Sequence, residues 1–161
     1  MKGEVRTEFH VHTRWSHDSA LGKHAMLAMC KLRHVSCVAI TDHNEIGGAL
    51  SFAPYLQRHG VDVIVGEEVF TSEGEIIGLY LSERIDAGLT PEETVEAIKR
   101  QDGIVYLPHP YDEKRYKTVL DADAVRRLAK SFVCGEVHNG RNVSTSFDAR
   151  QREIVFKSGM A

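Results

Sequence analysis

Short apolar segments alternate with amphipathic segments along most of this 161-residue chain. Runs of strand length, rich in apolar residues, lie at 6–12, 36–40, 61–65, 75–81, 103–107 and 132–139. Segments whose apolar residues recur with helical spacing lie at 20–33, 46–58, 91–101, 121–130 and 148–157. Because strands joined by helical crossovers lie parallel, this order predicts one α/β domain over residues 1–161 with a parallel sheet.

Polar side chains follow the ends of successive predicted strands. In parallel barrels these ends meet at one face of the molecule, and functional sites are built there. We therefore expect one site to contain His12, Asp42, His43, Glu68, His109, Glu136 and Asn139.

The pair His10 and His12 is the clearest candidate for metal ligation. In a strand, alternate residues leave the same face about 7 Å apart, so the two imidazoles form a half-site for a divalent ion. An isolated pair of this kind is more often solvent-facing or satisfied by hydrogen bonds. Nine histidines in 161 residues are a high count, which favours the metal interpretation here.

Four short motifs occur in order along the chain: H-x-H-T-x-x-S-x-D-S at 10–19, T-D-H-N at 41–44, G-E-E at 66–68 and P-H-P at 108–110. Together they resemble the PHP (polymerase and histidinol phosphatase) family of metal-dependent phosphoesterases. The stretches 74–81 and 136–142 are similar to its small stand-alone branch. The resemblance implies a distorted (β/α)7 TIM-like barrel holding two or three divalent ions, which would be Mn, Fe or Zn.

The resemblance also implies ligand roles for individual residues. His10 and His12 match ligands of a first metal, Glu68 matches a carboxylate that bridges two metals, and His109 matches a ligand of the second. These four would activate a metal-bound water. Asp18 and His43 match ligands of a third metal, although Asp18 could instead cap the helix that begins near residue 20.

Other polar residues are candidates for supporting roles. Asp42 and Glu136 are expected to orient histidines behind the ligands. Asn139 and Arg141 are expected to line the substrate pocket, and the planar guanidinium of Arg141 suits phosphate. Arg14 is a weaker candidate of the same kind, since a solvated surface charge is the simpler interpretation.

The chain departs from the family pattern at its C-terminus. The family carries an Asp-x-His motif after a further strand, and residues 157–161 lie where that strand should begin. We expect either a fragment lacking its last one or two strand-helix units or a site completed by a neighbouring subunit. An open barrel edge would also favour self-association.

The resulting functional hypothesis is a phosphoesterase that hydrolyses a nucleotide, a sugar phosphate or a short oligonucleotide by a metal-bridged hydroxide. One alternative is an amidohydrolase-like metal-dependent hydrolase. Such enzymes often use a metal-bridging lysine, which no predicted core strand supplies here. The other alternative is a metal-binding or regulatory module without catalysis.

Composition limits the partners and the cellular compartment that we expect for this chain. A net charge of −3 and the absence of a basic run give no general attraction to nucleic acid. Residues 1–6 lack the apolar core of a signal peptide, and no run approaches the roughly 18 apolar residues of a membrane span. Cys30, Cys37 and Cys134 lack C-x-x-C spacing. They are expected to be reduced, in a cytoplasmic protein.

Overall fold

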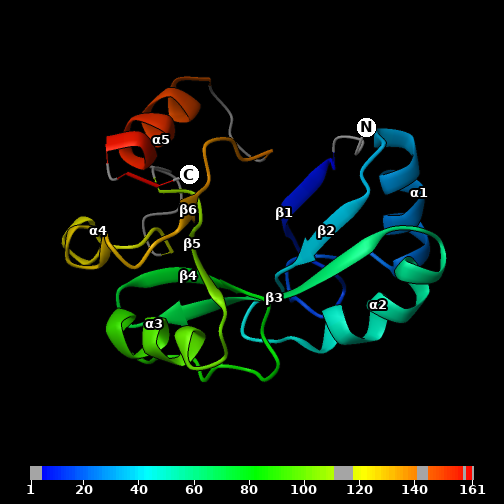
Figure 1. The fold of residues 1–161 in the computed structure, drawn as a ribbon, viewed down its shortest axis with the longest axis horizontal. Helices are drawn as coiled ribbons and strands as arrows, with labels where there is room; N and C mark the ends of the chain where they lie inside the picture. Colours follow the sequence, from blue (N-terminus) through cyan, green and yellow to red (C-terminus); the bar gives the residue numbers. More distant parts are fainter. Residues whose placement is uncertain (1–4, 111–117, 141–144, 158, 161) are drawn as a thin grey trace.

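The computed structural model describes residues 5–110, 118–140, 145–157 and 159–160. Within these residues one curled sheet of six strands forms a half-barrel, with strand order β1-β2-β3-β4-β5-β6 (Figure 1). The strands are β1 Thr7–Val11, β2 Cys37–Ile40, β3 Asp62–Thr71, β4 Gly74–Leu79, β5 Ile104–Leu107 and β6 Cys134–Gly135. The helices are α1 Lys23–Arg33, α2 Gly47–Arg58, α3 Pro91–Lys99, α4 Ala122–Leu128 and α5 Thr145–Lys157.

The sheet is only partly parallel. The pairs β1–β2, β2–β3 and β5–β6 are parallel, whereas β4 runs antiparallel to both β3 and β5. The cause is the short turn at Ser72 and Glu73, because two residues can join antiparallel strands but not parallel ones. The α/β class is confirmed as a half-barrel of TIM-like curvature, and the count of seven strand-helix units stays a prediction.

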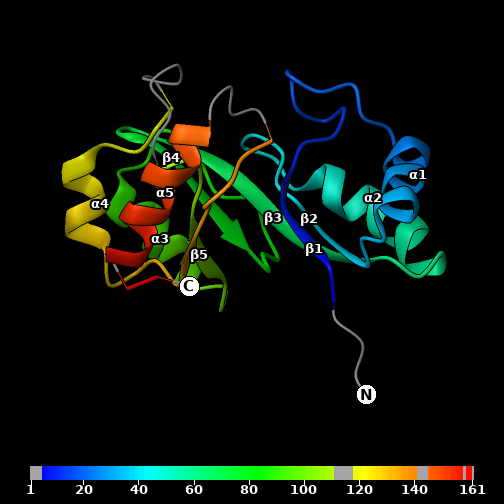
Figure 2. The ribbon, with the colours of Figure 1, turned by 90° about the horizontal axis from the view of Figure 1, so that it is seen from above.

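The helices cover the convex side of the sheet in two groups. The helices α1 and α2 lie together beside β1–β3, and α3, α4 and α5 lie beside β4–β6 (Figures 1 and 2). Each group has its own core, centred on Phe52 and Leu56 in the first and on Ile76 and Ile98 in the second. None of the helices in the described ranges has the length and apolar content needed to span a membrane.

The helix starts follow local sequence signals. Thr90 caps α3: its hydroxyl accepts from the Glu93 N–H at 3.2 Å, while the Glu93 carboxylate accepts from the Thr90 N–H at 2.9 Å. These two hydrogen bonds form a capping box, with Pro91 at the first position of the helix. The N-cap of α1 is Gly22, which supplies no side-chain cap, so Asp18 does not cap that helix.

Asp42 fixes the loop that follows β1. Its carboxylate accepts hydrogen bonds from the Thr13 N–H at 2.5 Å, the Thr13 hydroxyl at 2.7 Å and the Ser16 hydroxyl at 3.0 Å. Gly48, in the first turn of α2, packs directly against this carboxylate. A Cβ atom at Gly48 would lie 1.9 Å from Asp42 Oδ2 and 2.7 Å from the Thr13 hydroxyl. A hydrogen atom at this position lets the helix start approach the loop.

Glu67 anchors a second loop from the opposite face of β3. It is fully buried, and its Oε2 accepts from the Ile85 N–H at 2.9 Å. Its Oε1 has no hydrogen-bond partner among the described residues. Burial raises the pKa of Glu67 to about 7, with the Ile85 N–H only partly opposing this effect.

Replacing Gly48 by Ala should destabilise the protein by about 3 kcal/mol, at the upper end of overpacking costs, because the nearest atom belongs to a carboxylate held by three hydrogen bonds. The matched control is Gly22→Ala, where a new Cβ meets nothing within 4 Å. It should cost less than about 1 kcal/mol. Urea denaturation measures both, and equal losses would contradict the close packing at Gly48.

Replacing Glu67 by Gln should change how stability depends on pH. A carboxyl whose pKa is higher in the folded state than its ordinary 4.5 loses folding stability as pH rises from about 4.5 to about 7. Between about pH 4 and pH 8 the variant should therefore gain up to about 3 kcal/mol relative to the parent protein.

Thermal or urea unfolding in chelator measures this difference in the free energy of unfolding. The control is Asp86→Asn, which removes an acid whose side chain is 80% exposed in the loop that Glu67 anchors. Parallel pH profiles for the parent and the Glu67 variant would show that the carboxyl is not perturbed.

Candidate metal centre

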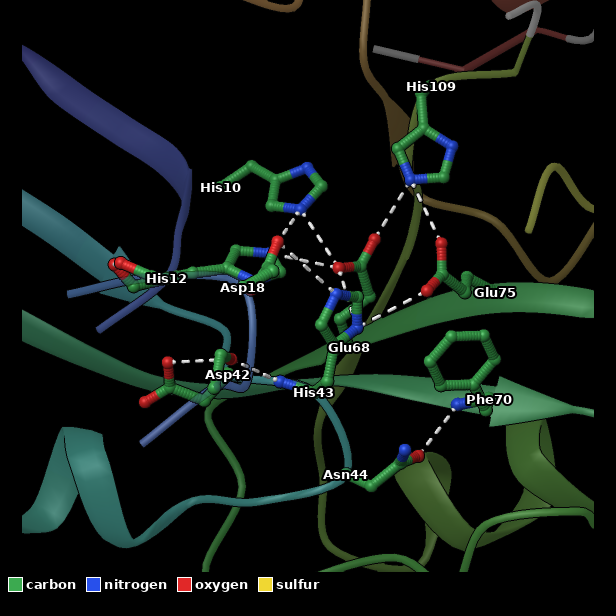
Figure 3. Close-up of polar contacts among 12 residues, drawn as sticks. His10, His12, Asp18, Asp42, His43, Asn44, Glu68, Phe70, Glu75 and His109 are labelled. Atoms are coloured by element: carbon green, nitrogen blue, oxygen red, sulfur yellow. Dashed lines mark hydrogen bonds and ion pairs between the residues drawn. The ribbon is translucent and has the colours of Figure 1, made fainter. Parts of the chain in front are cut away.

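Strand β1 presents the first two site residues. His10 lies in the strand and His12 directly after it, so both imidazoles leave the same side of the chain (Figure 3). Their Nε2 atoms lie 3.0 Å apart. Two ring nitrogens at this distance converge on one small volume, as the H-x-H spacing predicts.

Glu68 is the centre of the cluster. Its Oε2 lies 3.2 Å from His10 Nε2 and 2.9 Å from His12 Nε2. The same oxygen lies 3.2 Å from His43 Nδ1, and Oε1 lies 2.9 Å from His109 Nε2 (Figure 3). The carboxylate is completely buried. One acid therefore meets four imidazoles, which come from three separate segments of the chain.

The register of the sheet explains this central position. We expected the third strand to stop at residue 65, but β3 continues to Thr71 and carries Glu68 in its interior. His43 forms an isolated parallel bridge with Glu68, and the Glu68 N–H donates to the Asp42 carbonyl at 3.1 Å. These backbone contacts bring the loop after β2 to the side of β3.

Glu75 is a site residue that the sequence reasoning missed. In the β3–β4 register Glu68 is opposite Ile77 and Phe70 is opposite Glu75, so the two glutamates lie diagonally on one face. Glu75 Oε1 lies 3.2 Å from His43 Nδ1, and Oε2 lies 3.3 Å from His109 Nε2. An acid in a wholly buried, otherwise apolar strand was the available signal, because such a charge requires partners.

Asp18 reaches the cluster from the loop after β1. Its Oδ1 lies 3.2 Å from His12 Nδ1, and its Oδ2 lies 3.8 Å from His43 Nε2. The structure thus brings together all six predicted metal-site residues, and it adds Glu75. It groups them differently from the resemblance, since two compact sets of ligand atoms form, His10–Glu68–His109 and His12–His43–Glu68.

The donor atoms fit a divalent ion. Ligand atoms at about 2.1 Å from a shared ion in tetrahedral geometry lie roughly 3.0–3.5 Å apart, which is the spacing seen here. Glu68 Oε2 and both Glu75 oxygens are buried and make no hydrogen bond to the described residues, despite their close nitrogens. Mixed imidazole and carboxylate donors suit Zn, Mn or Fe.

Glu136 supports two of the histidines from behind. Its Oε1 lies 3.4 Å from His10 Nδ1, and its Oε2 accepts from the His109 backbone N–H at 2.6 Å. The Asn139 amide donates to both Glu136 oxygens at 3.1 Å. His109 has φ of 27°, a backbone conformation that is sparsely populated by non-glycine residues. Glu136 therefore helps to hold His109 in a strained position.

The charges in the cluster shift several pKa values. Burial alone would lower the pKa of His10, but Glu68 and Glu136 outweigh it and raise that pKa to about 10. Burial alone would raise the pKa of Glu68, but His10 and its neighbours hold it well below the usual range. The pKa of His43 is lowered, because burial exceeds the effect of Glu68. Glu68 is therefore an anion that strongly favours nearby positive charge.

The remaining predicted residues lie around this centre. Asp42 binds the loop after β1, and none of its three side-chain hydrogen bonds described above comes from a histidine. Asn139 lines a trough of about 840 Å³ between β1 and residues 134–140, which His10 and His12 also line. Arg14 lies outside this trough, with its guanidinium carbon 6.0 Å from the Phe52 ring centroid. Arg141 lies outside the described residues.

Two proteins of Methanocaldococcus jannaschii are similar in sequence. The uncharacterised protein MJ1587 is 41% identical over 117 residues, which cover 66% of this chain and 68% of that protein. The uncharacterised protein MJ0417 is 32% identical over 159 residues, which cover 98% of this chain and 62% of that protein. The chain thus spans less than two thirds of the length of MJ0417.

Two solved structures share the fold. A presumed metal-dependent phosphoesterase from Bifidobacterium adolescentis matches 98% of this chain and 85% of its own, with a TM-score of 0.77 and 12% identity. An amidohydrolase from Chromobacterium violaceum, solved with sulfate and no metal, matches 97% and 84%, with a TM-score of 0.74 and 17% identity. In addition, the family model described as the PHP domain matches residues 8–157. The chain therefore belongs to the PHP domain family, as its motifs predicted.

Proposed function

We propose that this chain is a metal-dependent phosphoesterase that binds at least two divalent ions and hydrolyses a phosphate ester. The observation that carries the proposal is the burial of Glu68 among four imidazoles and beside Glu75. Family membership and the two structural relatives support a metal-dependent hydrolase. The phosphate ester as substrate is our inference from the chemistry of the site.

The residues divide into two ligand sets with Glu68 in common. His10 and His109 would hold one ion with Glu68, and His12 and His43 would hold the other. A carboxylate can serve both sets because it has two oxygens. When bound, divalent ions supply a low-pKa water as nucleophile and polarise the phosphoryl oxygens. Mn, Fe or Zn would fit these donors.

The chain itself contributes orientation and access. Glu136 faces the Nδ1 side of His10, which leaves Nε2 directed at the cluster. The trough opens to His10 and His12, so a substrate can reach the ligand sets from the side of β1. Asn139 lies on the wall of the trough and would shape the substrate site there, while its amide donates to Glu136.

An amidohydrolase remains the alternative, because one structural relative carries that description. The described lysines Lys23, Lys31, Lys99, Lys130 and Lys157 lie on the helices or just after α4. None of these could bridge two ions from a core strand. The ligand cluster is common to both functions, so the substrate decides between them.

Replacing Glu68 by Gln should reduce metal affinity by at least about 100-fold, because the shared anion of both ligand sets is lost. Hydrolysis of bis(p-nitrophenyl) phosphate should fall with it. The matched control is Glu67→Gln, since Glu67 is equally buried but faces the other side of β3.

Metal content by mass spectrometry and titration calorimetry with Mn²⁺ and Zn²⁺ measure the effect. Equal metal binding by the two variants would refute the site. Turnover of p-nitroanilide substrates with none of phosphate esters would instead favour the amidohydrolase.

Replacing Glu75 by Gln should weaken one of the bound ions by about 10–100-fold, because Glu75 contacts His43 and His109 from beside both ligand sets. The matched control is Glu73→Gln in the same hairpin, whose carboxylate pairs with Arg127 at the surface. Metal stoichiometry after dialysis measures the loss. Full stoichiometry in the Glu75 variant would show that Glu75 only balances charge.

A further inference from the structure

The helices α1 and α2 carry positive side chains and no acid. The sequence has no Asp or Glu between Ser19 and Thr41, or between Ile46 and Val61. The net charge of −3 conceals this asymmetry, because the acids lie elsewhere in the chain. The basic and imidazole side chains on or directly after these two helices are Lys23, His24, Lys31, Arg33, His34, Arg58 and His59.

Contacts between the two helices join several of these side chains into one surface. Lys23 Nζ lies 5.2 Å from the centroid of the Tyr55 ring, and the Tyr55 hydroxyl lies 2.9 Å from His24 Nδ1. The rings of Tyr55 and His59 lie 4.5 Å apart, and Lys31 donates to the His59 carbonyl at 2.7 Å. We call these five residues the α1–α2 strip. The sequence contains no run of basic residues that would indicate the strip, because the strip forms only when the two helices pack together.

The strip continues to the metal centre through the loop after β1. Arg14 in that loop lies over the Phe52 ring, one helical turn before Tyr55 on α2. His17 in the same loop stacks on His43, with ring centroids 5.2 Å apart. The loop after β1 therefore places one cation at α2 and one imidazole at the ligand cluster, between the strip and the metal centre.

We propose that the α1–α2 strip binds the backbone of a single-stranded nucleic acid, one phosphodiester of which reaches the metal centre. This inference rests on the proposed phosphoesterase function and narrows its substrate to an oligonucleotide. The two helices carry these cations with no acid of their own, and clustered cations attract a polyanion and release its counterions. The rings of Tyr55, His24 and His59, between the lysines, provide surfaces on which bases stack.

Fluorescence anisotropy with a labelled oligothymidylate of about 12 nucleotides tests the strip directly. The measurement is made in chelator, so that binding is read without cleavage. Affinity should fall linearly on a logarithmic scale between about 50 and about 200 mM salt. The double variant Lys23→Gln/Lys31→Gln should bind at least about tenfold more weakly, and its salt slope should be shallower by about 1.4, since each lost phosphate contact removes about 0.7.

The matched control is Lys99→Gln/Lys130→Gln on the opposite side of the molecule. It removes the same charge, and Lys99, like Lys31, donates one hydrogen bond, to the Ser131 hydroxyl at 3.1 Å. The control should bind the oligonucleotide like the parent protein. Absence of binding at low salt, or equal binding by both double variants, would overturn the inference.

Activity measurements and vesicle binding separate this inference from failure of the proposed function and from binding to a membrane surface. The Lys23→Gln/Lys31→Gln variant should hydrolyse bis(p-nitrophenyl) phosphate normally while its KM for the oligonucleotide rises. If neither the parent protein nor its variants hydrolyse either compound, the proposed function is refuted. The anisotropy measurement in chelator still tests whether the strip binds the oligonucleotide. Strip-dependent binding to phosphatidylserine vesicles without binding to the oligonucleotide would overturn the inference in favour of a membrane surface.

Discussion

A single buried carboxylate governs the arrangement of this molecule. Glu68 has no contact with solvent, and its negative charge is balanced by imidazoles that β1, the loop after β2 and the end of β5 deliver to it. A buried charge without partners would cost several kcal/mol. The strands therefore have to end where their histidines reach β3, and the curl of the sheet makes this possible (Figures 1 and 3).

The backbone around the cluster is held in conformations that few residues adopt. His109 and Asn44, next to His43, both have positive φ. Each is tied down by a separate contact: the Glu136 carboxylate accepts from the His109 N–H, and the Asn44 side-chain carbonyl accepts from the Phe70 N–H at 2.8 Å. Strained residues that surrounding contacts over-determine are typical of functional sites. The precision of the ligand sets depends on these supporting polar groups as much as on the ligands.

Sequence patterns were sufficient for the elements and for the set of residues that converge. Apolar periodicity located every helix to within a few residues, and the ends of predicted strands pointed to His12, His43, Glu68 and His109. The predicted parallel sheet was wrong at β4, which runs antiparallel to β3 because a two-residue turn joins them. Glu75 and the pairing of His10 with His109 depend on sheet register and on distances between distant segments, which no local pattern encodes.

The position of β3 has a mechanical consequence. The two groups of helices have separate cores on either side of this long strand, and the ligand sets take His10, His12 and His43 from one side and His109 from the other. Any ion bound there would cross-link the two halves, which otherwise meet through β3 and through a third apolar cluster that includes Ala39, Ile64 and Tyr106. By mass action, the ion concentration then contributes to the free energy that holds the two halves together. Metal supply would thus govern the rigidity of the whole domain as well as its chemistry.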